Sequence, residues 1–216
     1  MNVKRLVVAA SLAAVLATIG VAQEAKKAAD KPAAAPPADF KLPAGWTQAD
    51  LQACIAAGTP GANHERLTKD AGVWEGKNTM WMGPGSDPVK SDSKTTVTPM
   101  LDGRFVKLEM AGEMPGMGPY IGFAISGYDN VSKKFVSTWI DNHGTGLATG
   151  EGELSKDGKT LTWNYTFNCP ITNKPALLRQ IETVTGPGTK TLEMFGADPK
   201  TGKEYKMMVI ELTKRK

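Results

Sequence analysis

The amino-acid sequence predicts an all-β fold, an up-and-down antiparallel barrel of about ten strands preceded by short capping helices. The 23 glycines and 14 prolines in the 216 residues mark many turns, which favours short strands over long helices. From Gly72 onward, apolar and polar residues alternate with a period of two, as in strands with one buried face. No long crossover segment interrupts the sequential hairpins, so a barrel is favoured over a sandwich.

Ten alternating runs separated by turn signals are expected to be strands. The clearest alternation places Leu161, Trp163, Tyr165 and Phe167 on one face of a single strand. Asp-Gly pairs at 102–103 and 157–158 are strong signals for tight hairpin turns. The predicted strands are 73–82, 92–98, 104–110, 120–128, 134–141, 147–154, 160–167, 177–185, 189–195 and 204–213.

The first residues, 1–22, are typical of a signal peptide. Lys4 and Arg5 precede an uncharged run of Ala, Val and Leu that ends in small residues, which predicts cleavage before Gln23. An uncleaved membrane anchor is the alternative, but the apolar run is short for a bilayer span. We therefore expect an exported protein, periplasmic or extracellular, with no membrane span after processing.

The next two segments lead into the barrel domain, which is expected over 72–216. Residues 23–44 are rich in Ala, Pro and Lys, and are interpreted as a linker. Residues 45–71 are expected to form a short helical cap, in which Thr47 and Asp50 begin the first helix as N-cap and N3 residues. A second helical turn is expected over 63–71.

A series of short motifs resembles one known family. Over residues 63–214 the chain resembles the bacterial domain of unknown function family 1579, which is grouped with the calycins. In calycins a Gly-x-Trp motif opens the first strand, and the resemblance implies that Trp74 closes the bottom of the barrel. No activity is established for that family, so the resemblance leaves function open. The motifs are HERL at 64–67, GVWEG at 72–76, LDGRF at 101–105, GYDN at 127–130, FVSTWID at 135–141 and TG at 145–146.

Aromatic residues on alternating positions indicate a binding cavity. Trp139 and Asp141 are two residues apart and so point to the same side of the sheet. If this face and the aromatic face of 160–167 point inward, they line a pocket for a small apolar or amphipathic molecule. A filled hydrophobic core needs the same residues and is the alternative. The residues predicted to contact a ligand are Arg104, Tyr128, Trp139, Asp141, Trp163, Tyr165 and Phe167.

Two other classes of function stay open. One is an enzyme in which Asp141 and His143 act as an acid–base pair with Arg104 at the barrel mouth. The other is a ligand-free structural or interaction module. Nucleic-acid binding is not expected, because no segment combines clustered Lys and Arg with aromatic residues, and the net charge falls from +4 to +2 when Lys4 and Arg5 are removed. The sequence leaves the oligomeric state open.

No cofactor or metal is predicted. The chain has two histidines and none after His143, so it lacks the C-terminal histidine that binds haem in the related ten-stranded barrel nitrobindin. Met110, Met114 and Met117 are either thioether ligands for Cu(I) or, more in keeping with their Gly/Pro context, a soft apolar lip over the barrel mouth. Cys54 and Cys169 are predicted to form a disulfide, and two free thiols are the alternative.

Overall fold

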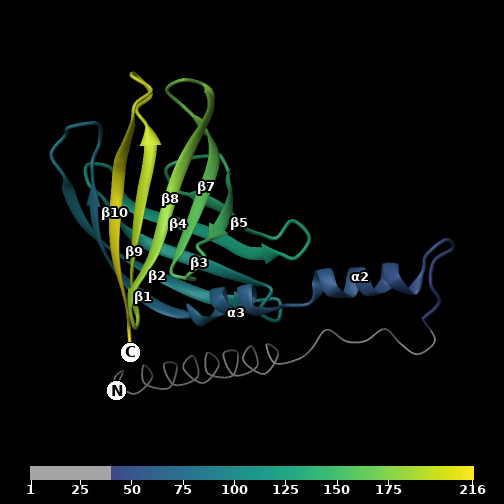
Figure 1. The fold of residues 1–216 in the computed structure, drawn as a ribbon. Helices are drawn as coiled ribbons and strands as arrows, with labels where there is room; N and C mark the ends of the chain where they lie inside the picture. The colour runs from purple at the N-terminus through teal and green to yellow at the C-terminus, as the bar shows by residue number, and fades with distance from the viewer. Residues whose placement is uncertain (1–39) are drawn as a thin grey trace, which may run out of the picture.

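The computed structural model describes residues 40–216 (Figure 1). The predicted signal peptide and most of the predicted linker lie outside these residues. Two helices come first, α2 (Gln48–Gly58) and α3 (Ala62–Lys69). Ten strands follow: β1 (Gly72–Met80), β2 (Val89–Met100), β3 (Phe105–Met114), β4 (Gly118–Asp129), β5 (Lys134–Asp141), β6 (Ala148–Leu154), β7 (Thr160–Cys169), β8 (Lys174–Gly186), β9 (Thr189–Ala197) and β10 (Glu204–Lys214).

The ten strands form one closed barrel. Each strand pairs antiparallel with its neighbours in sequence, and β1 pairs with β10. This confirms the predicted fold class, and every predicted strand is present. β2 and β8 begin earlier than predicted, because their first residues Val89 and Lys174 pair with Met80 and Cys169 on the preceding strands. Partner strands therefore extend the sheet into segments that lack a clear alternation of their own.

The connections between strands lie at two opposite ends of the barrel, because neighbouring strands run in opposite directions. The turns after β2, β4, β6 and β8 lie at the same end as the start of β1 and helix α3, which contacts β3 and β4. We call this end the α3 end. The connections after β1, β3, β5, β7 and β9 lie at the opposite end, which we call the far end. Of the two helices, α3 is the one that covers the barrel, through buried His64 and Leu67.

Close packing fills the α3 end. Trp74 is only 4% exposed, and its indole N–H donates a hydrogen bond to the Asp70 carbonyl at 2.8 Å. This is the position that the calycin resemblance implies for Trp74. The His64 ring meets the Tyr128 ring edge-on at 5.8 Å, and burial lowers the pKa of His64. The buried core consists of Leu67, Trp74, Val97, Val106, Phe135, Leu161, Trp163, Tyr165, Ile210 and Leu212.

Lys190 is a buried charge within this packed end. Its ammonium donates to Asp70 Oδ2 at 2.6 Å and to Glu182 Oε1 at 3.0 Å. It also lies 4.6 Å from the centre of the Trp74 ring. Burial lowers the pKa of Lys190, but the charges and hydrogen bonds of the two carboxylates outweigh burial and hold that pKa above its ordinary value. The charged lysine therefore joins the end of α3 to β8 and β9.

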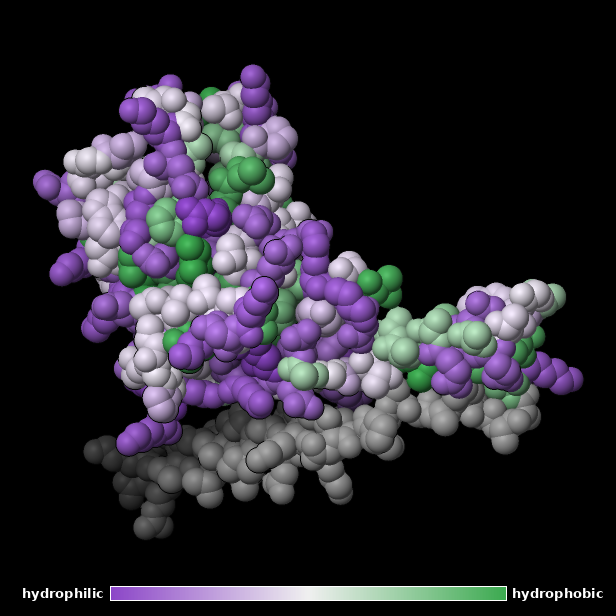
Figure 2. Space-filling model, in the orientation of Figure 1, coloured by the Kyte–Doolittle hydropathy of each residue, from purple (hydrophilic) through white to green (hydrophobic). Residues whose placement is uncertain are grey.

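Helix α2 begins as predicted but extends away from the barrel (Figure 1). Asp50 N donates to Thr47 Oγ1 at 3.2 Å, and the Asp50 carboxylate accepts from Thr47 N at 2.8 Å, which completes a capping box. No residue of α2 is buried. Figure 2 shows apolar residues beside polar ones on this arm, and Trp46 just before it is also exposed. Packing on the barrel therefore contributes little to holding α2 in place.

Hydrogen bonds at its C-terminal end attach α2 to the barrel. The Asn130 amide donates to the carbonyls of Ala57 at 3.1 Å and Thr59 at 2.8 Å, and Arg104 Nε donates to Gly58 O at 3.0 Å. The last carbonyls of a helix have no partner within the helix, and here two turns of the barrel supply the donors. Asn130 is in the turn after β4, and Arg104 is in the turn after β2.

We expect Asn130→Ala to release α2 from the barrel without unfolding the barrel. The substitution removes the donor to these carbonyls, and an isolated 11-residue helix is marginal in water. Hydrogen exchange followed by mass spectrometry should show faster exchange in 48–58 and unchanged exchange in β1 to β10. Val131→Ala is the control, since Val131 is 75% exposed beside Asn130. Equal exchange in the two variants would contradict this attachment.

The predicted disulfide is absent, and both cysteines are free. Cys54 is exposed on α2 beside the α3 end, whereas Cys169 ends β7 at the far end. A strand the length of β7 spans about 33 Å, whereas bridged cysteines have Cα atoms within about 7 Å. The direction of β7 therefore separates the two thiols. None of the helices in 40–216 has the length and apolar character needed to span a membrane.

Candidate functional site

The inward side chains divide the barrel into a packed half and a looser half. Inward residues toward the α3 end, such as Phe135, Leu161 and Trp163, are buried. The large inward residues toward the far end are mostly apolar but only half-buried, and some of them pack on the core from that side. We call this region the far half and treat it as the candidate site. Its half-buried residues include Met80, Met110, Tyr120, Trp139, Ala148, Phe167, Leu178, Met194 and Met208.

Methionines form one wall of the far half. Met80, Met208 and Met194 lie directly opposite one another across β1, β10 and β9, so they share the inward face. A bulge in β10 brings Met207 to the same side, where a Cβ added to Gly196 would lie 2.6 Å from its sulfur. Thioether side chains are flexible and polarisable, so this wall adapts to the shape of an apolar partner. We call these four residues the methionine wall.

Two stacked aromatic rings form the opposite wall. Strands β4 and β5 lie five places around the ten-stranded ring from β9 and β10, so their inward residues face the methionine wall. The rings of Tyr120 and Trp139 are nearly parallel, with an interplanar angle of 17° and centroids 6.4 Å apart. The Trp139 ring lies directly over Gly122, where an added Cβ would come within 2.2 Å of it. Glycine at this position therefore makes room for the indole.

Asp141 joins these aromatic residues in one hydrogen-bonded cluster. Its Oδ2 accepts from Tyr120 OH and from Trp139 Nε1, both at 3.0 Å. Its Oδ1 accepts from the backbone N–H of His143 at 2.9 Å. Burial and the charge of Asp141 raise the pKa of Tyr120, so the phenol keeps its proton and remains a donor. The cluster fixes the orientation of both rings and holds a carboxylate at the far end.

His143 does not use its ring to contact Asp141. Its Nε2 lies 3.2 Å from the Pro119 carbonyl, and its ring lies 5.4 Å from the Tyr120 ring. An acid–base pair requires the ring nitrogen within hydrogen-bond reach of the carboxylate. In this arrangement the backbone of His143 supports Asp141, while the ring extends the aromatic surface.

The structure divides the predicted site residues between the two ends. Arg104 lies at the α3 end, where it binds the end of α2, so the predicted grouping of Arg104 with Asp141 is wrong. Tyr128 is also at the α3 end and packs on Phe135, with ring centroids 5.0 Å apart. Spacing within one strand does not show this separation, although it follows from the alternating strand directions of the predicted barrel: β3 and β5 run the same way, so the start of β3 and the end of β5 lie at opposite ends.

The aromatic residues of β7 run from the core into the far half. Trp163 and Tyr165 are buried and stacked, with centroids 5.8 Å apart. Burial raises the pKa of Tyr165 to about 12. Phe167 is half-buried nearer the far end. Of the predicted residues, Trp139, Asp141 and Phe167 therefore lie in the far half, and Tyr165 lies at its base.

Sequence reasoning missed Tyr120 and the methionine wall. The inward positions of β4 between Tyr120 and Tyr128 carry only Gly, Ala and Ser, so Tyr120 is the one large inward residue near the far end of that strand. The contrast between one large aromatic residue and the small residues that follow it on the same face could have marked Tyr120 as a candidate site residue from the sequence. The methionine wall had no comparable signal within one strand, because its members come from three strands: β9 and β10 are joined by the register of their hairpin, and β1 meets β10 only when the barrel closes.

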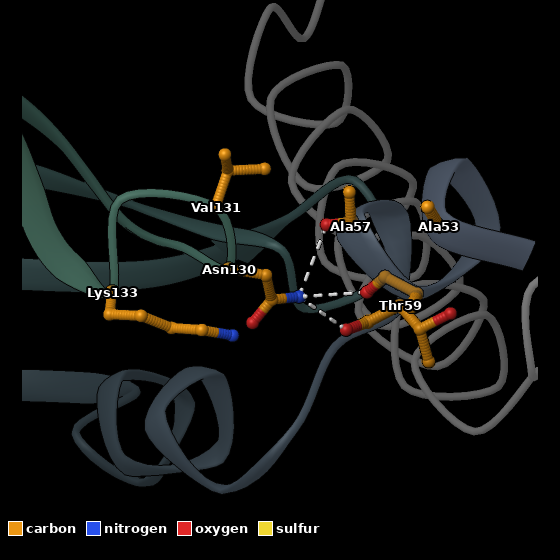
Figure 3. Close-up of a pocket in the computed structure, with 7 residues that line it drawn as sticks. Ala53, Ala57, Thr59, Asn130, Val131 and Lys133 are labelled. Atoms are coloured by element: carbon orange, nitrogen blue, oxygen red, sulfur yellow. Dashed lines mark hydrogen bonds between the residues drawn. The ribbon is translucent and has the colours of Figure 1, made fainter. Parts of the chain in front are cut away.

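Two hollows lie on the outside of the barrel, away from the far half. One, of about 540 Å³, lies between α2 and the turn after β4 and is lined by Ala53, Ala57, Asn130 and Lys133 (Figure 3). Figure 3 shows the Asn130 amide directed at the helix carbonyls, so attachment of α2 already uses this polar group. The other, of about 740 Å³, lies on the outer faces of strands β3 to β8. Within residues 40–216, no three His, Cys, Asp or Glu side chains are placed to hold a metal ion.

The sequence of residues 59–214 matches the protein-family model described as "Protein of unknown function (DUF1579)". The chain belongs to this family. The match confirms the resemblance seen in the sequence motifs, and it includes α3, all ten strands and every residue of the far half. A search of curated proteins returned no match for this DUF1579 chain.

Solved structures with the same fold include two of distant sequence. Rv2717c from M. tuberculosis aligns with a TM-score of 0.56 and 11% identity, over 72% of this DUF1579 chain and 99% of Rv2717c. The S-type phycobiliprotein lyase CPES from Guillardia theta aligns with a TM-score of 0.51 and 9% identity, over 70% of this chain and 92% of the lyase. At these identities the likeness shows a shared barrel fold.

Proposed function

We propose that this protein binds a small apolar or amphipathic molecule in the far half of its barrel, and that it does so after export. The observation that carries the proposal is the pair of facing walls, methionine on one side and aromatic on the other, both inward and only half-buried. A barrel that serves only as a structural module has no need to leave large apolar side chains partly exposed at one end. Ligand pockets combine such apolar walls with a few polar groups, here Asp141 and Tyr120.

The geometry favours binding over acid–base catalysis. The Asp141 carboxylate already accepts three hydrogen bonds, from two side chains and one backbone N–H. The His143 ring faces a carbonyl rather than that carboxylate. These contacts orient the aromatic wall, which serves a binding site.

Nile red, a neutral apolar dye, provides a direct test. We expect its fluorescence to rise and shift to the blue when it is titrated with the protein. Met208→Gln should weaken binding about tenfold, because an amide that loses water without a partner costs roughly 1–2 kcal/mol. The side chain keeps its length, so the fold should be retained, as far-ultraviolet circular dichroism will show.

Val209→Gln is the matched control. Val209 is next to Met208 on β10 but faces outward, opposite Glu193 and Thr79. Its dye affinity should equal that of the wild type. No binding of Nile red by the wild type, or equal losses in the two variants, would count against a site in the far half.

A further inference from the structure

We propose that the far half selects ligands that carry a positively charged head group, which binds against Asp141 and the neighbouring aromatic rings. This inference rests on the proposed function and narrows its ligand class to amphipathic cations. The preference for a cationic head group does not depend on the size and shape of the ligand's apolar portion, which the methionine wall accommodates.

The first observation is an uncompensated negative charge at an inward position. Among the described residues, Asp141 is the one charged side chain at an inward far-half position on the six strands that form the two walls and their neighbours. These strands are β1, β3, β4, β5, β9 and β10. Within residues 40–216, Asp141 forms no ion pair with a Lys, Arg or His side chain. Its three hydrogen-bond donors are all neutral groups. Because a carboxylate offers about four acceptor positions, Asp141 has room for one more donor.

The second observation is the aromatic surface around that charge. Tyr120 and Trp139 are stacked beside the carboxylate, and the His143 ring lies next to Tyr120. Ring faces attract cations, and aromatic residues grouped around a cationic head are a general way to bind alkylammonium groups. A carboxylate held at the edge of such a surface also attracts the cation, through Coulombic interaction between opposite charges.

The same groups disfavour anionic ligands. The carboxylate of a fatty acid at the far end would lie beside Asp141 and the negative ring faces. Among the described residues, no Lys or Arg on these six strands points into the far half to compensate, and Lys174, at the inward register position opposite Cys169 on β8, is exposed and lies three strands away from Asp141. The buried Lys190 is at the α3 end, where Asp70 and Glu182 already occupy it.

Competition among three ligands with the same dodecyl chain tests the proposal. Nile red is bound first and then displaced by dodecyltrimethylammonium or dodecanoate, each below its critical micelle concentration, or by dodecanol below its solubility limit. We expect the ammonium compound to compete about tenfold better than the alcohol, and the carboxylate to compete worst. The advantage of the cation should shrink as salt is added, because part of Asp141 is accessible to solvent.

Asp141→Asn assigns the preference to one residue. The amide keeps the size of the side chain and removes the charge, so the ammonium compound and the alcohol should then compete about equally. Glu211→Gln is the control, because it makes the same change in net charge on the outer face of β10. It should keep the preference of the wild type. If Asp141→Asn does not fold, the salt dependence of the wild type alone still decides the matter.

The outcomes separate the two proposals. Failure of Nile red to bind would overturn the proposed function. Binding of Nile red with equal competition by all three compounds would leave binding intact and overturn the cation preference. A preference for dodecanoate, or a cation preference that survives in Asp141→Asn or at high salt, would also overturn it.

Discussion

Replacing Lys190 with methionine is expected to lower the free energy of unfolding by about 3 kcal/mol or more. The substitution leaves the carboxylates of Asp70 and Glu182 beside each other in the packed end without their shared cation. It also removes the cation above the Trp74 ring. Because Asp70 remains partly exposed, water reduces the penalty at that carboxylate, and we expect a value at the lower end of the range for buried pairs.

Urea denaturation followed by tryptophan fluorescence measures this loss. Lys77→Met is the control, because Lys77 pairs with Asp92 on the surface, where both side chains are 73% exposed. Exposed ion pairs contribute roughly 0–1 kcal/mol, so the control should be close to the wild type. Similar losses in the two variants would mean that the buried lysine contributes no more than a surface one.

The effect should depend on pH in a defined direction. The pKa of Lys190 is raised in the folded state above its ordinary value of 10.5. The stabilisation is therefore fully present below pH 10.5 and is lost as the pH rises through the raised pKa. The difference in stability between the wild type and Lys190→Met should accordingly shrink in strongly alkaline solution.

Gly122→Ala should damage both stability and binding. The added methyl would lie 2.2 Å from Cζ2 and 2.7 Å from Cη2 of Trp139, so the indole must move. Moving it breaks the hydrogen bond from Trp139 to Asp141 and disrupts the aromatic wall. Overpacking of this kind costs roughly 1–3 kcal/mol, and a contact loss of about 1.4 kcal/mol in the site would weaken Nile red binding about tenfold.

A second glycine provides the control for this substitution. Gly146 lies in the connection after β5, and a Cβ added there meets no atom within 4 Å. Gly146→Ala should leave both the melting temperature and the dye affinity unchanged. If Gly122→Ala behaves like Gly146→Ala, the indole is free to move and the proposed wall is not rigid.

The fold was predictable because its signals are local. Each strand carries its own alternation, and β7 shows this most clearly, with Leu161, Trp163 and Tyr165 inward as expected. Thr47 and Asp50 likewise specify the start of α2 through neighbouring residues alone. Trp74 was placed through family resemblance rather than through any local pattern.

The candidate site was only partly predicted, because its residues come together through strand direction and inter-strand register as well as through the pattern within each strand. Trp139 and Asp141 were paired correctly, since a spacing of two on one strand guarantees a shared face. Arg104 was grouped with them wrongly, because a residue at the start of β3 and a residue at the end of β5 lie at opposite ends. Met194 lies opposite Met208 in the β9–β10 hairpin, past a bulge in β10, and Met80 joins them only when β1 pairs with β10 to close the barrel. Periodicity within one strand carries no information on either register.

An even number of antiparallel strands also places the first and last residues of the barrel at the same end of the barrel. The chain enters the barrel at Gly72 and leaves it at Lys214, both at the α3 end, where the Lys214 ammonium donates to the Lys69 carbonyl at 3.0 Å. A surface or fused domain joined directly at Gly72 or Lys214 would therefore hold the α3 end and leave the cluster around Asp141 at the end that faces away from it.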